Sequence, residues 1–331
     1  MVKVGLIGCG HWGPNHIRNF NSLPNATVKS CADLEEERLV KMRTMFPGIQ
    51  TTTDYNDILN DSEIDAVVVA TPTGTHFDIT RKALNSKKDV LCEKPLTISL
   101  DESKELVKLS EKNNRILMVG HVFLFNAGIQ KLYELIQEGV LGKIYYIHCS
   151  RTNLGPIRSD VNVVYDLASH DIYICSYLLG NSYPTGVIAK GEDFLQPKIE
   201  DVAFISLSFP GKILANIHVS WIDPKKIRQI TVVGDKKMAI WSDLDNEEPI
   251  KIFDKGVLKE PYYDNYGEFR LITREGDINS PKINLTEPLR GQSIHFVECV
   301  EKRIKPICDG ESGYKVVEVL EKVQNALKNI N

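Results

Sequence analysis

The sequence has none of the long apolar runs or secretion signals that direct a protein into or across a membrane. No stretch reaches the roughly 18 uninterrupted apolar residues of a membrane-spanning helix. The N-terminal run MVKVGLIGCG lacks the apolar core and small-residue cleavage site of a signal peptide. The seven cysteines form no CxxC pair and lie mostly inside apolar runs, so we expect buried thiols in a reducing compartment. These absences predict a cytoplasmic protein without a membrane partner.

An excess of charge of one sign is also missing. The 40 Lys and Arg residues are interspersed with 44 Asp and Glu residues, which gives a net charge of -4. A nucleic-acid partner is therefore not expected. The sequence contains no internal repeat, and its 331 residues predict two globular domains.

The first 120 residues alternate short apolar runs with longer helical patterns. The predicted strands are apolar throughout, as expected when both faces of a sheet are covered. They lie in the runs KVGLIGCG, ATVKSCAD, IDAVVVATP, DVLCEKP and RILMVGHVF. Alternating strands and helices of this length predict a parallel sheet with helices on both faces. We therefore predict an α/β fold whose first domain, residues 1–122, is a Rossmann-type doubly wound parallel sheet.

After about residue 124 the runs become longer and show period-two character. This pattern of apolar residues predicts an α+β domain, residues 123–331, built on a large, open, mostly antiparallel sheet. We expect one helix at VVYDLASHDIYICSYLLG, and loop and edge strands in the polar residues 250–285. Two closing helices are predicted near 288–303 and 312–328, placed so that they could pack back on the first domain.

A GxGxxG motif follows the first predicted strand and opens the first helix. It runs Gly8-Cys9-Gly10-His11-Trp12-Gly13. In a dinucleotide-binding fold the first glycine allows the tight turn, the second admits the pyrophosphate, and the third lets the helix pack on the strand. Three glycines in six residues also occur in ordinary loops. The position after a strand and before a helix favours a cofactor loop, in which His11 and Trp12 would also contact the cofactor.

An acidic residue ends the second predicted strand. Asp33 lies 20 residues after Gly13, where a carboxylate hydrogen-bonds the adenosine ribose 2′-hydroxyl. A 2′-phosphate would meet it as a like charge, and the following residues LEEER are mainly acidic. We therefore expect NAD rather than NADP.

Two further loops follow strands of the predicted parallel sheet, at the edge where open α/β sheets bind ligands. One contains Thr71, Pro72, Thr73 and His76, which we predict to contact the cofactor, although the segment also suits a helix-capping turn. The other contains Glu93 and Lys94 before Pro95, whose peptide bond could be cis. An exposed loop lysine is the simplest interpretation of Lys94. A lysine at this edge, however, could hydrogen-bond a substrate hydroxyl beside the nicotinamide.

The helix YDLASHDIY carries a possible acid/base pair. Asp166 and His170 are four residues apart and therefore share one helical face. A histidine near its ordinary pKa can accept a proton at neutral pH, and an aspartate one turn away could orient it or hold a substrate hydroxyl. The same spacing occurs on solvated helix faces. It could also serve a metal, but no third ligand stands at a recognisable spacing, so we predict no metal site.

Taken in order, the segments GLIGCGHWG, ATPTGTH, CEKP and DLASHD resemble the glucose–fructose oxidoreductase / inositol dehydrogenase family, Gfo/Idh/MocA. The likeness covers nearly the whole chain. It implies that Lys94 lies beside substrate and nicotinamide, and that Asp166 and His170 form the D-x-x-x-H pair with the histidine as acid/base. It also implies assembly into a homodimer or homotetramer through the second domain's sheet.

Within this family, the segments GCGHWGPNHIRNF, GHVFLFNAG and RTNLGPIRSDVNVVYDLASHD resemble the nucleotide-sugar 3-dehydrogenases. The resemblance implies oxidation at C3 of a sugar such as UDP-N-acetylglucosamine or its uronate. The polar candidates for contacting the sugar or its phosphates are Arg151, Arg158, Asn162 and Tyr165. Arginine suits phosphate, but either arginine could equally be a surface residue.

The sequence thus predicts an NAD-dependent dehydrogenase. His170, or Lys94 through a shared hydrogen bond, would accept the hydroxyl proton while hydride leaves the same carbon, and Asp166 would orient the sugar or the histidine. Two alternatives stay open. A free polyol or cyclitol dehydrogenase would use the same residues with another pocket, and a regulator could bind the cofactor without catalysis.

Overall fold

The structure is a computed structural model that describes residues 1–261 and 269–328. The chain forms two compact units. Unit 1 comprises residues 1–125 and 286–321, and unit 2 comprises residues 126–285 and 322–331. No helix among the described residues is long and apolar enough to cross a membrane.

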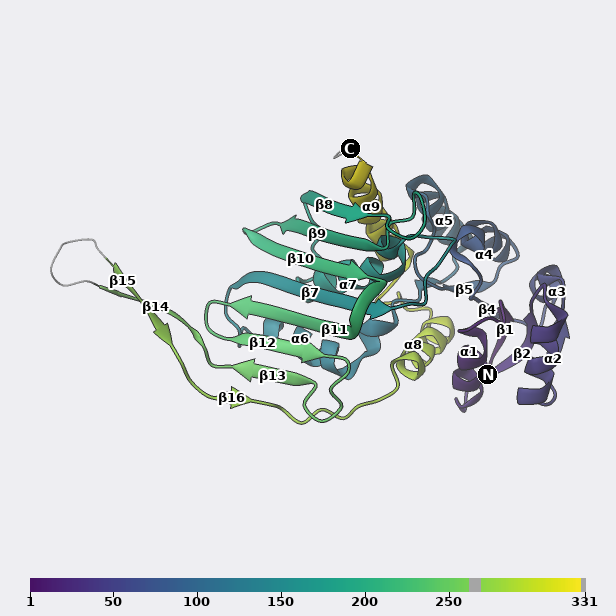
Figure 1. Cartoon of the computed structure of the whole chain (residues 1–331). Coiled ribbons are helices and arrows are strands. Elements are labelled where there is room, and N and C mark those ends of the chain that lie inside the picture. The colour runs from purple at the N-terminus through teal and green to yellow at the C-terminus, as the bar shows by residue number, and fades with distance from the viewer. Residues whose placement is uncertain (262–268, 329–331) are drawn as a thin grey trace. The chain divides into compact units, whose positions relative to one another are not determined.

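Unit 1 is built on a six-stranded parallel sheet with the order β3-β2-β1-β4-β5-β6. Its strands are β1 (Val2–Ile7), β2 (Ala26–Ala32), β3 (Gln50–Thr52), β4 (Ala66–Val69), β5 (Asp89–Cys92) and β6 (Leu117–Val119). Its helices are α1 (Gly13–Asn21), α2 (Glu36–Met45), α3 (Tyr55–Asn60), α4 (His76–Asn85), α5 (Leu100–Asn113) and α8 (Pro288–Lys302), with the 3-10 turns η1 (Thr73–Thr75) and η2 (Val122–Phe125). Helices cover both faces of this sheet (Figure 1). The predicted doubly wound Rossmann sheet is confirmed.

The central strands β4 and β5 of unit 1 are apolar, apart from Asp89 at the start of β5, because both of their faces are buried. Every residue of β4 and β5 is buried, as expected of a parallel sheet covered by helices. The strand order reverses between β1 and β4, since β2 and β3 lie on one side of β1 and β5 and β6 on the other. This reversal is the topological switch point, where such sheets bind ligands.

Unit 2 is built on an eight-stranded sheet with the order β16-β13-β12-β11-β7-β10-β9-β8. Its strands are β7 (Ile144–Leu154), β8 (Gly186–Glu192), β9 (Val202–Phe209), β10 (Ile213–Ser220), β11 (Ile222–Gly234), β12 (Met238–Ser242), β13 (Ile250–Phe253) and β16 (Ile278–Asn279). All of its pairings are antiparallel except that of β7 with β10. The predicted open, mostly antiparallel sheet is therefore confirmed. β14 (Gly256–Pro261) pairs antiparallel with β15 (Phe269–Arg274) in a separate two-stranded sheet.

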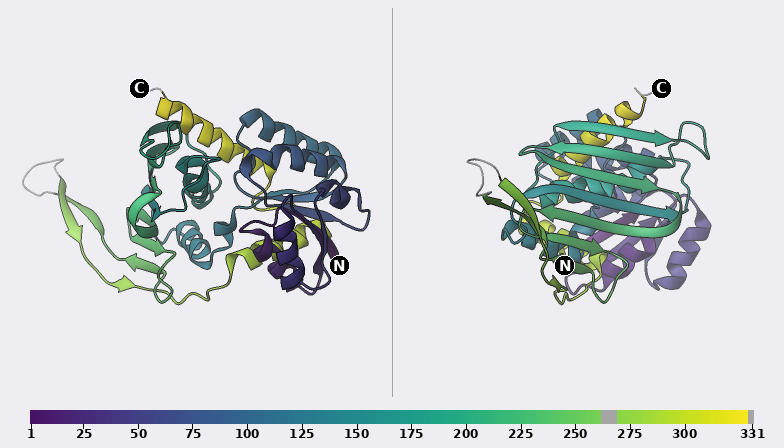
Figure 2. Two further views of the ribbon diagram at one scale, coloured as in Figure 1. Left: turned by 45° about the vertical axis from the view of Figure 1, so that its right-hand side comes forward. Right: turned by 60° about the vertical axis from the view of Figure 1, so that its left-hand side comes forward.

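One face of this sheet is packed against helices and the other is open. α6 (Ala127–Gln137) and α7 (Ser169–Leu178) lie behind the strands in the right-hand view of Figure 2. Alternate residues of β9 are buried and exposed, as expected of a sheet with one covered face. The open face carries large apolar side chains, among them Ile188, Phe204 and Leu214, and the ring of Phe204 stacks on that of His218 at 4.4 Å.

Several segments differ from the sequence-based expectation. The predicted helix of residues 163–180 begins as a π-helix, η3 (Val164–Ala168), before α7 continues it. The polar residues 250–285 contain strands as expected, β13 to β16, while residues 262–268 lie outside the described residues. The last helix, α9 (Gly310–Lys328), begins slightly earlier than expected, and its residues up to 321 belong to unit 1.

Candidate active site

The glycine motif forms the tight turn between β1 and α1. Gly8 has φ of +101°, and a Cβ atom there would lie 2.5 Å from the carbonyl oxygen of Ala70. A Cβ at Gly13 would lie 2.7 Å from the carbonyl oxygen of Gly8. At Gly10, by contrast, the nearest atom is 3.9 Å away, in the Arg38 side chain. The first and third glycines are therefore required by the protein's own packing, and the second leaves the loop open on the side where a pyrophosphate would approach.

Asp33 ties this loop to the end of β2. One carboxylate oxygen accepts the amide N–H of Cys9 at 2.7 Å, and the other accepts that of Glu35 at 2.9 Å. Arg38 lies 3.5 Å from the same carboxylate. Two of the predicted cofactor residues, His11 and Trp12, are exposed and meet edge to face at 5.4 Å. The side chains expected around the adenosine half of a dinucleotide thus lie in one loop cluster.

The loops after β1, β4 and β5 lie side by side at the carboxyl edge of the sheet. A row of backbone hydrogen bonds continues the sheet into them: Ala70 donates to Ile7, and Glu93 donates to Val69, at 2.8 and 2.9 Å. Their predicted site residues therefore occupy the same edge, next to the switch point.

His76 is fully buried and links two of these loops. Its Nδ1 lies 2.8 Å from the carbonyl oxygen of Pro95, and its Nε2 lies 2.9 Å from that of Thr71. Since a carbonyl oxygen only accepts, both ring nitrogens must carry a proton, so the ring is an imidazolium. Burial acts to lower the pKa of His76, but the neighbouring Cys92 sulfur and the two carbonyls outweigh it and raise the pKa to about 9.

The pairing of His76 gives it a structural part in addition to the predicted contact with the cofactor, which stays a prediction. Thr71 is joined to Thr75 by a hydroxyl hydrogen bond of 2.8 Å, and Thr73 is buried in η1. This segment is therefore also a hydrogen-bonded turn before α4, although the side chain of the N-cap residue Thr75 does not cap that helix.

Lys94 directly follows the end of β5 and is half-buried, with a cis bond to Pro95. The buried His121, which follows β6, is a close electrostatic neighbour. Burial first, and then the positive charge of Lys94, lower the pKa of His121 to about 3. The lysine is therefore flanked by a neutral imidazole, in a setting far from that of an ordinary exposed loop lysine.

In unit 2, Asp166 lies in the π-helix η3 and His170 in the first turn of α7, and both are half-buried. The carboxylate of Asp166 accepts from Arg158 Nη1 at 3.1 Å and from the indole Nε1 of Trp221 at 3.1 Å. π-Helical turns inside helices are frequent at functional sites. Trp221, which follows β10, is a residue that sequence reasoning missed, because nothing near position 166 in the sequence points to a partner 55 residues away.

The remaining predicted sugar contacts have partners of their own. Arg151 is buried and forms a bidentate ion pair with Asp171, with both distances 2.8 Å. Asn162 donates to Glu200 and Gln324 at 2.5 and 2.7 Å. The amide of the half-buried Tyr165 in turn donates to the Asn162 side chain. The pair of Arg151 with Asp171 fixes α7 on β7. Arg158 is paired as well, with Asp160 at 2.6 and 2.9 Å and with Asp166 at 3.1 Å.

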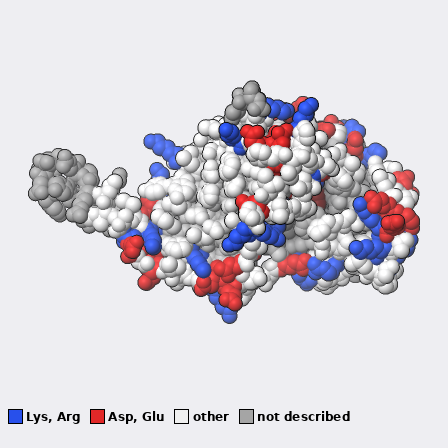
Figure 3. All heavy atoms as spheres, in the orientation of Figure 1, with Lys and Arg blue, Asp and Glu red and all other residues white. Residues whose placement is uncertain are grey.

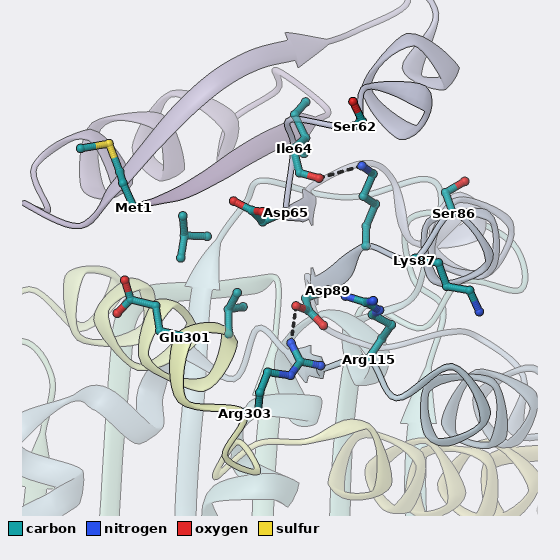
Figure 4. Close-up of a pocket in the computed structure, with 13 residues that line it drawn as sticks. Met1, Ser62, Ile64, Asp65, Ser86, Lys87, Asp89, Arg115, Glu301 and Arg303 are labelled. Carbon is teal, nitrogen blue, oxygen red and sulfur yellow. Dashed lines mark hydrogen bonds and ion pairs between the residues drawn. The ribbon is translucent and has the colours of Figure 1, made fainter.

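A polar cavity of about 500 Å³ opens at the opposite, amino edge of the unit 1 sheet (Figure 4). Its charged residues serve each other and the backbone. Arg303 pairs with Asp89 at 2.6 Å, and Lys88 donates to two backbone carbonyls at 2.6 and 2.7 Å. The cavity therefore lies away from the predicted chemistry. Among the described residues no group of three or more His, Cys, Asp or Glu could hold a metal ion.

Fold and site together define an oxidoreductase with an NAD-binding Rossmann domain. Residues 2–121 match the family described as "Oxidoreductase family, NAD-binding Rossmann fold", and residues 129–240 match the GFO/IDH/MocA C-terminal domain. The chain belongs to the Gfo/Idh/MocA oxidoreductase family.

Individual relatives agree with this assignment. An uncharacterized oxidoreductase, YrbE of Bacillus subtilis, is 28% identical, over 98% of this chain and 94% of its own length. The myo-inositol 2-dehydrogenase of Thermotoga maritima is 26% identical, over 77% of this chain and 79% of its own. Among solved structures, the UDP-N-acetylglucosamine 3-dehydrogenase GnnA of Acidithiobacillus ferrooxidans superposes with a TM-score of 0.83 at 21% identity, covering 99% of this chain and 98% of that one. This last likeness concerns the fold.

Proposed function

We propose that the protein oxidises a hydroxyl-bearing carbon of a sugar with NAD, most specifically C3 of a nucleotide-linked hexose such as UDP-N-acetylglucosamine or its uronate. The observation that carries the proposal is the place of Lys94, half-buried at the carboxyl edge of an NAD-binding sheet and beside the switch point. A bound nicotinamide supplies the hydride acceptor. The protein's part is to bind and orient the sugar and to move one proton.

The hydride leaves the hydroxyl-bearing carbon, and the proton leaves the hydroxyl oxygen on that carbon. His170 accepts the hydroxyl proton as the C–H hydride departs, which leaves a ketone. Lys94 donates a hydrogen bond to the same oxygen and stabilises the negative charge that develops there. Asp166, already held by Arg158 and Trp221, orients the sugar or the His170 ring. Because a carboxylate fixed by two donors loses little freedom on binding, this arrangement suits positioning.

Three observations bear on the cofactor and substrate. Asp33 presents a carboxylate next to the glycine loop, which favours NAD over NADP, since a 2′-phosphate would be repelled. Arg158 is half-buried and already pairs with Asp160 and Asp166, so a phosphate of the nucleotide would share its planar fork with these carboxylates. All seven cysteines are free and buried, which supports a reducing, cytoplasmic compartment.

A free polyol or cyclitol dehydrogenase is the second candidate function. It is favoured by the 26% identical myo-inositol 2-dehydrogenase, which covers 77% of the chain. The same Lys94, Asp166 and His170 would act on a substrate without a nucleotide. A cofactor-binding regulator without catalysis is a weaker alternative, because all three catalytic candidates are present.

We also propose that two or four copies associate through the open face of the unit 2 sheet. This face carries Ile188, Phe204 and Leu214, each more than half exposed. In Figure 3 uncharged side chains predominate over the strands of this sheet. A second copy of the chain offers the matching apolar surface, as a two-fold interface requires.

Absorbance at 340 nm with NAD tests the function. The panel consists of UDP- and dTDP-hexoses beside free sugars and inositol. A rise with UDP-N-acetylglucosamine or its uronate and not with free sugars would support the proposal, and a rise with free polyols alone would favour the second candidate. No change in absorbance with any member of the panel, together with no tightly bound NADH in the purified protein, would contradict both candidate functions.

A further inference from the structure

Helix α1 supplies a histidine to the segment that carries Lys94. His16 is fully buried, and its Nε2 lies 2.9 Å from Oε1 of Glu93, which is 77 residues further along the chain. The Glu93 side chain is itself only 13% exposed. A buried carboxylate needs such a partner, since leaving it without hydrogen bonds would be costly.

The hydrogen-bond pattern identifies the protonated nitrogen of His16. A carboxylate only accepts, so Nε2 carries the proton and donates. Nδ1 is buried and has no hydrogen-bond partner among the described residues. A proton on Nδ1 alone would leave a buried N–H without an acceptor and would leave Glu93 without its donor. Nε2 is therefore the ring nitrogen that donates to Glu93.

The other carboxylate oxygen of Glu93 is fixed from a different side. The backbone N–H of Lys94 donates to Oε2 at 3.3 Å. Gly120, directly after β6, approaches so closely that a Cβ atom there would lie 2.8 Å from Oε2 and 3.1 Å from Glu93 Cα. Three separate elements, α1, the end of β5 and the end of β6, thus enclose this one carboxylate.

The charge of Glu93 follows from these neighbours. Burial acts to raise its pKa, but the hydrogen bond from His16 and the positive charge of Lys94 outweigh burial, so the pKa lies below its ordinary value. The titratable groups that face Glu93 are His16 from α1 and Lys94 from its own loop. His121, after β6, faces Lys94.

We propose that His16 is a positioning residue for the reaction. Through Glu93, it fixes the turn that presents Lys94 to the substrate. The inference rests on the proposed function, in which Lys94 hydrogen-bonds the reacting oxygen, and it adds a residue that makes no contact with the substrate. Gly120 belongs to the same arrangement because it leaves the space that the Glu93 carboxylate fills.

Two substitutions separate this role from a merely structural one. His16→Gln keeps an N–H donor at nearly the position of Nε2, whereas His16→Leu removes it at similar volume. We expect His16→Gln to keep kcat close to wild type and His16→Leu to lose on the order of 10²-fold, the cost of a misplaced catalytic group. The acidic limb of the pH profile of kcat/KM should move to higher pH in His16→Leu only, because Glu93 then loses the donor that lowers its pKa. The control His295→Gln replaces a histidine of α8 outside this arrangement and should leave both readouts unchanged.

A second readout does not depend on activity. Side-chain 15N NMR of histidine-labelled full-length protein, with the His16 signals assigned by their absence from His16→Gln, should show a proton on Nε2 of His16. An Nδ1–H tautomer would overturn the inference, even if His16→Leu fails to fold. So would equal kcat and equal acidic limbs in His16→Leu and His16→Gln. Wild-type inactivity on the whole substrate panel would instead contradict the proposed function, and the NMR result would still decide the contact of His16 with Glu93.

Discussion

At the scale of single residues, the protein fixes the carboxylates of Asp33, Asp166 and Glu93 in the candidate site with at least two of its own donors each. Asp33 accepts from the amides of Cys9 and Glu35, and Asp166 accepts from Arg158 and Trp221. Glu93 follows the same rule with His16 and the Lys94 amide. Donors that are already in place need no reorganisation when charge develops in the reaction, and this is the main way in which a folded protein lowers such a barrier.

Asp33 is expected to set the choice of cofactor. Replacing Asp33 with Asn keeps the shape and one acceptor oxygen but removes the negative charge. NADH binding should weaken about 10-fold, in line with the loss of a hydrogen bond to a charged group. NADPH binding should strengthen because the 2′-phosphate is no longer repelled. Fluorescence titration of both reduced cofactors measures this shift, and equal affinity of the wild type for the two would contradict the role of Asp33.

At the scale of elements, the carboxyl edge of the unit 1 sheet is held together by side chains as well as by the backbone hydrogen bonds between its strands. His76, at the start of α4, joins the loop after β4 to the loop after β5 through two carbonyl oxygens. As an imidazolium it holds the loop that contains Lys94. The stability of the folded protein therefore depends on the protonation of the His76 ring.

This link predicts how stability depends on pH. The pKa of His76 is about 9 in the folded chain against an ordinary value of 6.5. A raised pKa contributes stability that is fully present below about pH 6.5 and is lost as the pH rises through about 9. The contribution is on the order of 3 kcal/mol. In guanidinium unfolding, the free energy of unfolding of wild type should exceed that of His76→Leu at pH 6.5, and this difference should become markedly smaller at pH 9.5. A difference that is independent of pH would contradict the charged state of His76.

The sequence was sufficient for those elements whose pattern is local. The apolar strands and the GxGxxG turn indicate the Rossmann sheet. Strands buried on both faces consist of consecutive apolar residues, and the glycine turn is a motif of six consecutive residues, so both can be recognised locally. The contacts His16–Glu93 and Trp221–Asp166 join residues 77 and 55 positions apart, and no periodicity encodes them. The burial of Arg151 follows from its pairing with Asp171 across β7 and α7, which a charged residue in a strand does not reveal. The π-helical start at Val164 likewise has no local signal.

At the scale of the whole molecule, the open face of the unit 2 sheet is the surface that a second copy would cover. Phe204 is 52% exposed on it and stacks on His218. Single exposed apolar residues are common, but a row of them on neighbouring strands marks an interaction surface.

Self-association through this face can be tested by one substitution that introduces a negative charge. Light scattering after size-exclusion chromatography should give a dimer or tetramer for the wild type and a smaller species for Phe204→Asp, because the substitution would bury a carboxylate in the interface. The control Val40→Asp changes a side chain of α2 that is 50% exposed and should keep the wild-type mass. A monomeric wild type, or an unchanged mass for Phe204→Asp, would contradict this use of the sheet.

The most direct test of the central claim is turnover of the wild type, Lys94→Ala and His170→Ala with NAD and the best substrate of the panel, measured beside NADH binding. Loss of the Lys94 hydrogen bond or of the His170 base should reduce kcat on the order of 10²- to 10⁴-fold. NADH binding should stay nearly intact, because the glycine loop and Asp33 are untouched. Turnover comparable to wild type in both variants would contradict the assignment of these residues and the mechanism built on them.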